Sequence, residues 1–246
     1  MMAINAHLKF PSAPREIPIG LDRDGISFSM PRSAAASLDG FREWYTSEET
    51  PDRCKISFLG DEVYFEMSPE RINSYVSLKA EIISVLLQHA KSTGHGFAFA
   101  DGVLVTNKSA QLSNEPDGMF IRRETVRSGA VTLLRTKDGQ DLIEVVGSPD
   151  LVVEFVSPSS VHKDRKRLRD RYAIAGVQEY WLIDTRDGDV NLQMLAASSR
   201  GFVEVPDQEG WFRSEVLGLD VRLNRHDDHE FSVWWYVMEL GLPAPH

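Results

Sequence analysis

Two short runs rich in apolar and aromatic residues predict the first strands of the main body. These runs are residues 55–59 and 62–67, and the Gly-Asp pair between them is a two-residue turn, so a β-hairpin is predicted. Ser68 and the proline after it are typical of a helix start. Apolar side chains then recur mostly at helical spacing over 72–90, which predicts a long amphipathic helix that ends before Gly94.

A second block of the pattern predicts a strand, a helix and another strand. Residues 151–156 are apolar on both faces apart from one glutamate, as in a buried strand. The Ser-Pro-Ser-Ser sequence at 157–160 favours a helix start, and Gly176 is a suitable C-terminal cap. Residues 180–184 form another buried strand. This order implies parallel pairing through a right-handed crossover, and so an α/β or α+β fold with a mixed central sheet flanked by helices.

The same pattern divides the chain into three parts. Residues 1–50, which are interrupted by prolines, are interpreted as an N-terminal arm, and 51–225 as a single domain. Within that domain, 121–148 is expected to be an inserted hairpin and 107–114 a polar loop. Residues 226–246 are assigned to a C-terminal tail.

Composition narrows the class of protein. The chain has 246 residues, of which 42% are apolar and 26% charged, as in ordinary globular proteins, and no apolar run is long enough to span a bilayer. Cys54 is the single cysteine, which excludes an internal disulfide framework and a cysteine-based zinc cluster. We expect no secretory signal and a reducing, cytoplasmic setting. The net charge of −10 counts against a nucleic-acid binder.

One segment departs from this acidic total. Between residues 159 and 172, six positive side chains face two negative ones, a local balance of +4. The positive residues are Lys163, Arg165, Lys166, Arg167, Arg169 and Arg171. A solvated helix face is one interpretation of this segment, and a contact surface for nucleic acid or an acidic partner is the other.

Two carboxylates are the candidates for chemistry. Glu154 lies in the otherwise apolar strand, where a charge is costly unless it is paired or bound to a cation. Asp117 follows Pro116 directly, ahead of another apolar stretch. If the two strands are neighbours, the pair could bind Mg²⁺ or Mn²⁺, because such ions take hard oxygen ligands and keep several waters. Asp117 could instead cap a turn.

The ordered set of motifs resembles a known family. Pro116-Asp117, the stretch from Glu154 to Ser159, Tyr172, and the stretch from Gly176 to Asp184 are together similar to the Uma-two family of restriction endonucleases, a branch of the PD-(D/E)XK nuclease superfamily. The resemblance covers roughly residues 53–223. It implies a restriction-endonuclease-like fold and a Mg²⁺-dependent nuclease site in which Asp117 and Glu154 match the two metal-binding acidic positions.

The chain departs from the family pattern at two positions. The family lysine often lies on the helix four residues before the tyrosine that matches Tyr172, and here that position is Leu168. A histidine often follows the Met-Ser-Pro segment, where this chain has Asn73. Lys163 is the candidate catalytic cation, with Arg165 and Lys166 as alternatives on the same helix.

The sequence therefore predicts an endonuclease that hydrolyses DNA with Asp117, Glu154 and Lys163 at its site. A homodimer with the 131–146 hairpin as its interface is an accompanying expectation, because nucleases that cut both strands are often dimers. The alternative from another class is a nuclease-fold module without catalysis that binds nucleic acid or a protein. A third alternative, hydrolysis of a small phosphorylated metabolite, lacks the glycine-rich loop that cradles phosphate.

Overall fold

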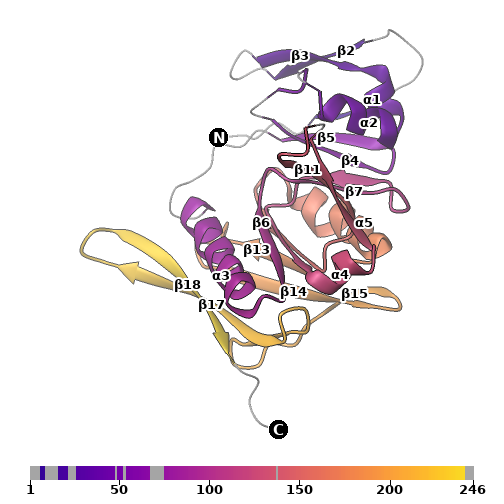
Figure 1. The fold of residues 1–246 in the computed structure, drawn as a ribbon. Helices are drawn as coiled ribbons and strands as arrows, with labels where there is room; N and C mark the ends of the chain where they lie inside the picture. Colours follow the sequence, from indigo (N-terminus) through magenta and orange to yellow (C-terminus); the bar gives the residue numbers. More distant parts are fainter. Residues whose placement is uncertain are drawn as a thin grey trace.

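The computed structural model describes residues 6–8, 16–21, 26–47, 49–51, 54–66, 75–136 and 138–241. These residues form a mixed α+β fold around two large sheets (Figure 1). The first sheet has seven strands in the order β1-β5-β4-β8-β7-β11-β10. Their bounds are β1 Ala6–Leu8, β4 Lys55–Leu59, β5 Glu62–Glu66, β7 Leu104–Asn107, β8 Leu112–Asn114, β10 Val131–Arg135 and β11 Leu142–Gly147.

The second sheet carries the predicted strand–helix–strand unit at its centre. Its six strands run in the order β15-β14-β13-β12-β9-β6, with β12 and β13 parallel and the others antiparallel to their neighbours. Their bounds are β6 Gly96–Ala100, β9 Gly118–Arg122, β12 Leu151–Val156, β13 Glu179–Asp184, β14 Asn191–Ser198 and β15 Gly201–Glu204. The parallel pair confirms the mixed sheet expected from the sequence.

The predicted hairpin near residue 60 is confirmed. Strands β4 and β5 pair antiparallel from Lys55 opposite Glu66 to Leu59 opposite Glu62. Gly60 in the turn has φ 78°, a backbone conformation that glycine adopts without steric cost. This pairing fixes Lys55 at the beginning of β4, next to the end of β5.

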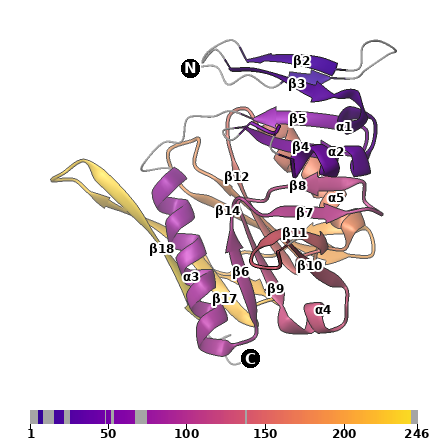
Figure 2. The ribbon, with the colours of Figure 1, turned by 45° about the horizontal axis from the view of Figure 1, so that its top comes forward.

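Helix α3 (Ser77–Thr93) covers one face of the six-stranded sheet, beside β6 and β9 (Figure 2). Its apolar side, which includes Leu78, Ile82 and Leu86, packs in one core cluster with Val153 and Trp181 from the sheet. The helix ends before Gly94, as predicted, and Gly94 has a left-handed conformation. The predicted start of this helix, together with Asn73, lies outside the described residues.

The second predicted helix lies on the opposite face of the sheet. It begins as a π-helical segment, η2 (Lys163–Leu168), and continues as α5 (Arg169–Ala175), with Gly176 at its C-cap as predicted. Leu168 and Tyr172 pack in a cluster with Val152 and Val156 of β12. Val152 and Val156 thus share one face of β12, and strand alternation puts Glu154 on that face between them.

The N-terminal segment docks on the seven-stranded sheet. Helices α1 (Arg32–Ala36) and α2 (Leu38–Tyr45) follow the two-stranded sheet of β2 (Glu16–Leu21) and β3 (Ile26–Pro31). Phe41 and Trp44 share a buried cluster with Ile56 and Phe65 of the first sheet. Arg42 adds two hydrogen bonds of 2.7 Å to the carboxylate of Glu144. The described part of the arm is therefore joined to the sheet by packing and by an ion pair.

The hairpin expected as an insertion is part of the main sheet. Strands β10 and β11 pair with each other as predicted, but β11 also pairs parallel with β7. Val131 and Val145 are buried in a cluster with Met119 and Ile121, which explains why the hairpin does not stand apart. The interface role expected for this hairpin is an untested prediction.

Two further segments differ from the expectation. Part of the polar loop expected at 107–114 is strand β8, between β4 and β7, where the hydroxyls of Ser113 and Thr106 pair at 2.8 Å and make a buried polar strand possible. Most of the expected tail belongs to β17 (Leu219–Asp228) and β18 (Val233–Gly241), which form a three-stranded sheet with β16 (Phe212–Ser214). This sheet packs against α3, where the Met238 N–H donates to Glu81. Figure 1 shows the β17–β18 hairpin extending away from the body.

A short helix, α4 (Arg123–Arg127), joins β9 to β10. Among the described residues, no helix is both long enough and apolar enough to cross a bilayer.

Candidate functional site

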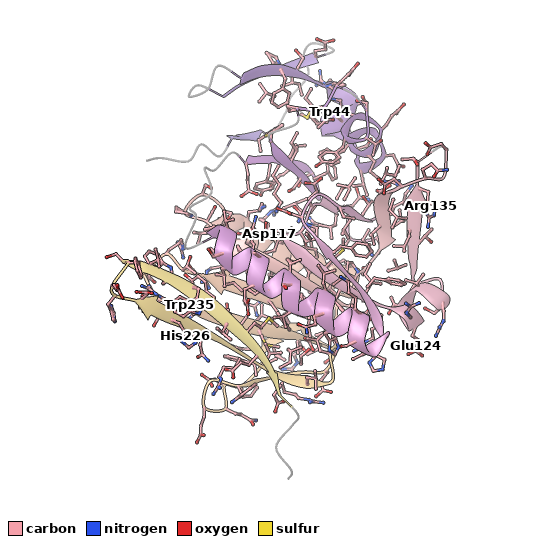
Figure 3. All side chains as sticks on the ribbon, turned by 60° about the vertical axis from the view of Figure 1, so that its left-hand side comes forward. Trp44, Asp117, Glu124, Arg135, His226 and Trp235 are labelled. Carbon is pink, nitrogen blue, oxygen red and sulfur yellow. The ribbon has the colours of Figure 1, made fainter. Side chains whose placement is uncertain are left out.

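Asp117 and Glu154 meet where the two large sheets adjoin. Strand β9 pairs antiparallel with β12 up to Gly118 opposite Val153, so the next pair along the register is Asp117 and Glu154. Asp117 is 8% exposed and Glu154 is 1% exposed. Figure 3 places Asp117 beside the N-terminal end of α3. The two candidate carboxylates thus lie together, as the sequence predicted.

Each carboxylate has one oxygen fixed by the fold. The Phe155 N–H donates to Oδ2 of Asp117 at 2.8 Å. Asn114 Nδ2 and the Tyr172 hydroxyl both donate to Oε1 of Glu154, at 2.9 and 3.0 Å. Asn114 is itself held by the Ser57 hydroxyl, which donates to its carbonyl oxygen. The two remaining oxygens, Asp117 Oδ1 and Glu154 Oε2, are left for a cation.

Two lysines approach these remaining oxygens. Lys55 Nζ lies 3.0 Å from Asp117 Oδ1 and 3.7 Å from Glu154 Oε2. Lys79 Nζ, from the first turns of α3, lies 3.2 Å from the same Asp117 oxygen and 3.4 Å from Asp101. Lys55 therefore contacts both carboxylates, whereas Lys79 is shared between Asp117 and a residue outside the pair.

The surroundings shift the pKa values of the two carboxyl groups in opposite directions. Burial alone would raise the pKa of Asp117, but Lys55, Lys79 and the Phe155 N–H outweigh burial and hold that pKa well below its usual range. Burial raises the pKa of Glu154 to about 8, because Lys55 offsets only part of the cost and the Asp117 charge adds to it. A pair in which one carboxyl group ionises readily and the other has a raised pKa is typical of functional sites.

Lys163, the lysine predicted from the sequence, has different partners. Its ammonium donates to Glu66 and lies 3.6 Å from Asp164 Oδ1. Lys163 and Asp164 are both buried, and burial raises the pKa of Asp164 to about 7. Lys163, Glu66 and Asp164 thus form a second charged cluster beside the carboxylate pair.

The other basic residues of the helix are engaged locally. Arg165 donates to Asp184 at 2.8 Å, and Arg167 pairs with Glu62. Arg169 and Arg171 donate to backbone carbonyl oxygens, at 2.9 and 3.1 Å. Lys166 is exposed. Most of the local positive charge therefore holds the helix to the protein, which differs from the solvated helix face expected under one interpretation of the segment.

Three residues of the site do not stand out in the sequence. Lys55 and Asn114 come from strands β4 and β8, and Tyr172 from α5, so no local motif joins them to Glu154. Tyr172 has a buried ring, and its hydroxyl also donates to the Glu154 carboxylate. Its place in the family pattern was the one available signal.

Replacement of Tyr172 by phenylalanine separates these two roles. The ring would keep its packing, and the lost hydroxyl would cost about 1 kcal/mol of unfolding free energy. Since the hydroxyl orients Glu154, we expect metal affinity or cleavage to fall between about 10- and 100-fold. Urea unfolding and Mn²⁺ calorimetry measure the two effects. Equal binding and cleavage by Y172F and the wild type would leave the hydroxyl with only a packing role.

The donors fit a small hard cation. Asp117 and Glu154 present one carboxylate oxygen each to the same place, and a lysine ammonium already balances them there. The carbonyl oxygen of Phe155 accepts from the Tyr75 hydroxyl at 3.2 Å. Among the described residues, no group of three or more His, Cys, Asp or Glu side chains could hold a metal. Two carboxylates completed by water suit Mg²⁺ or Mn²⁺.

Comparisons with known proteins agree with this fold. A solved structure described as a putative nuclease belonging to DUF820, from Anabaena variabilis, has a TM-score of 0.55 and 15% sequence identity. The match covers 74% of this chain and 90% of that chain, and at this identity it shows the shared fold. No curated protein matches the chain. The model of the Uma2 family, described as "Putative restriction endonuclease", matches residues 38–224, a stretch that holds every residue of the site. The chain therefore belongs to the Uma2 family.

Proposed function

We propose that this protein is a divalent-metal-dependent endonuclease that hydrolyses DNA phosphodiester bonds at the Asp117–Glu154 pair. The observation that supports this most is the pair itself, since two buried carboxylates on adjacent strands each turn one oxygen toward a shared cation. Membership of the Uma2 family supports the nuclease class.

In this proposal Asp117 and Glu154 hold Mg²⁺ or Mn²⁺. When bound, such an ion supplies Lewis-acid activation of water and charge neutralisation at the phosphate. Hydrolysis joins a water oxygen to phosphorus and breaks the bond from phosphorus to a sugar oxygen. The water loses a proton and the departing sugar oxygen gains one. The Phe155 N–H, Asn114 and Tyr172 keep the two carboxylates in place throughout.

The lysines around the pair offset the acidic surface locally. Lys55, Lys79 and Lys163 all lie within reach of acidic partners in this region. In a chain with a net charge of −10, the ammonium of Lys55, which contacts both carboxylates, is where a phosphate would meet positive charge. A DNA substrate would therefore be attracted to this site more than to the rest of the acidic surface.

The proposal is tested with the variant Asp117→Asn. Calorimetry with Mn²⁺ and cleavage of supercoiled plasmid are measured on the same samples. We expect the wild type to bind Mn²⁺ and to nick the plasmid. D117N should cleave at least about 100-fold more slowly, because it loses the carboxylate charge that Lys55 and Lys79 both contact. Asp150→Asn is the matched control, because Asp150 is also buried, at the other end of β12, and accepts from the Arg122 N–H.

A wild-type protein that neither binds Mn²⁺ nor cuts DNA would reject the proposal. It would favour the alternative of a nuclease-fold module without catalysis. Such a module that contacts phosphates would bind DNA with an affinity that falls steeply as salt rises. The local engagement of Arg165, Arg167 and Arg169 gives this alternative little free positive charge.

A further inference from the structure

We propose that Lys55 is the catalytic lysine of this site. It takes the place of the lysine that the family pattern puts on the helix after β12. In the free protein its ammonium balances Asp117 and Glu154. During cleavage it meets the phosphate. This inference rests on the proposed function and names a residue of the same site.

Geometry distinguishes Lys55 from the other two lysines. Among the described residues, it is the lysine with salt-bridge contacts to both Asp117 and Glu154. Lys79 contacts Asp117 and Asp101, and Lys163 contacts Glu66 and Asp164. The side chain of Lys55 is 22% exposed, against 16% for Lys79 and 3% for Lys163. Lys55 is therefore both central to the pair and the most accessible of the three.

The helix offers no equivalent cation. Leu168, at the position where the family often has lysine, is fully buried against Val156 and Tyr172 in an apolar cluster. Lys163 has its ammonium tied to Glu66. Val156, two residues after Glu154, is buried in the same cluster as Leu168. The two positions at which a lysine would match the family pattern, 156 on β12 and 168 on the helix, are thus occupied by apolar side chains.

The place of Lys55 on β4 suits a group that must move over a short distance. Its backbone is paired with Glu66 of β5 in the hairpin, so the Cα atom is held by the sheet. The four-carbon stem is flexible and carries a compact point charge. The ammonium can leave the carboxylates for a phosphate oxygen while the strand stays where it is.

Three lysine variants test the inference: Lys55→Met, with Lys79→Met and Lys163→Met as matched controls. Plasmid cleavage at saturating Mn²⁺, Mn²⁺ calorimetry and thermal unfolding with and without Mn²⁺ are measured for each. We expect K55M to bind Mn²⁺ but to cleave at least about 100-fold more slowly than the wild type. Because Lys55 no longer occupies the pair, Mn²⁺ should raise the melting temperature of K55M more than that of the wild type. K163M, which loses contacts to Glu66 and Asp164, should stay within about 10-fold of wild-type cleavage. Cleavage by K79M, which loses a contact to the Asp117 carboxylate, should fall by less than about 100-fold.

Lys55→Arg keeps the charge if K55M proves unfolded. Its planar guanidinium cannot replace a point charge, so K55R should bind Mn²⁺ normally and cleave more slowly. Wild-type cleavage by K55M or K55R overturns the inference but leaves the proposed function intact. Loss of Mn²⁺ binding in either variant, or a larger loss of cleavage in K163M, also overturns it. An inert wild type rejects the proposed function first.

Discussion

Replacement of Glu154 by glutamine should lower plasmid cleavage between about 100- and 1,000-fold while the protein stays folded. Glutamine has the same shape and can still accept from Asn114 and Tyr172 through its carbonyl oxygen. The change replaces the carboxylate oxygen that lies 3.7 Å from Lys55, so the side chain can no longer ionise and bind a cation. Cleavage and Mn²⁺ calorimetry report the lost function, and circular dichroism with urea unfolding reports the fold.

Glu144→Gln is the control for the loss of any buried glutamate. Glu144 is also buried, but it lies on β11 and pairs with Arg42. E144Q should lose stability and keep cleavage. Unfolding of E154Q would give Glu154 a structural role, and cleavage by E154Q as fast as by the wild type would remove Glu154 from the proposed site.

The free energy of unfolding of the metal-free protein should fall as pH rises from 5 to 9, and E154Q should lose part of this slope. Burial raises the pKa of Glu154 from its ordinary value of 4.5 to about 8 in the folded protein. Between these two values the folded state binds more protons than the unfolded chain, so its stability is highest below the lower value and is lost as pH passes the upper one. The total is on the order of a few kcal/mol.

Urea unfolding at several pH values, with a chelator present, measures this dependence. The stability of E154Q relative to the wild type should increase with pH. Asp164, whose pKa is raised from 3.8 to about 7 mainly by burial, contributes to the slope in the same direction, so D164N should remove a further part. Parallel curves for the wild type and E154Q would mean that Glu154 ionises normally in the folded protein.

Glu154 could be singled out from the sequence because the free-energy cost of burying its charge is evident from the apolar residues on either side of it. A carboxylate in a run of six buried positions has few roles besides binding a cation, and β12 is buried throughout. Asp117 needed the family pattern, since an aspartate after proline is equally suited to a turn. The strands and the helix between β12 and β13 followed from hydrophobic periodicity and from Gly176.

Lys55 and Asn114 could not be predicted, because their roles depend on contacts between distant strands. Asn114 is in a stretch of mixed polarity that reads as a loop, and only the pairing of β8 with β4 and β7 buries it beside Glu154. Lys55 begins an ordinary amphipathic strand. Lys163 is close to Glu154 in the sequence, but its ammonium bonds to Glu66, which lies 97 residues away along the chain.

One oxygen of each of the two carboxylates faces the Lys55 ammonium, and this arrangement affects which metal ion the site would prefer. Asp117 Oδ2 and Glu154 Oε1 already accept hydrogen bonds from the protein, which leaves one oxygen on each side chain. Calcium usually takes six to eight oxygens and often both oxygens of one carboxylate, whereas magnesium takes single oxygens in a strict octahedron and retains water. In the proposed site, two single oxygens held by hydrogen bonds would therefore suit magnesium better than calcium.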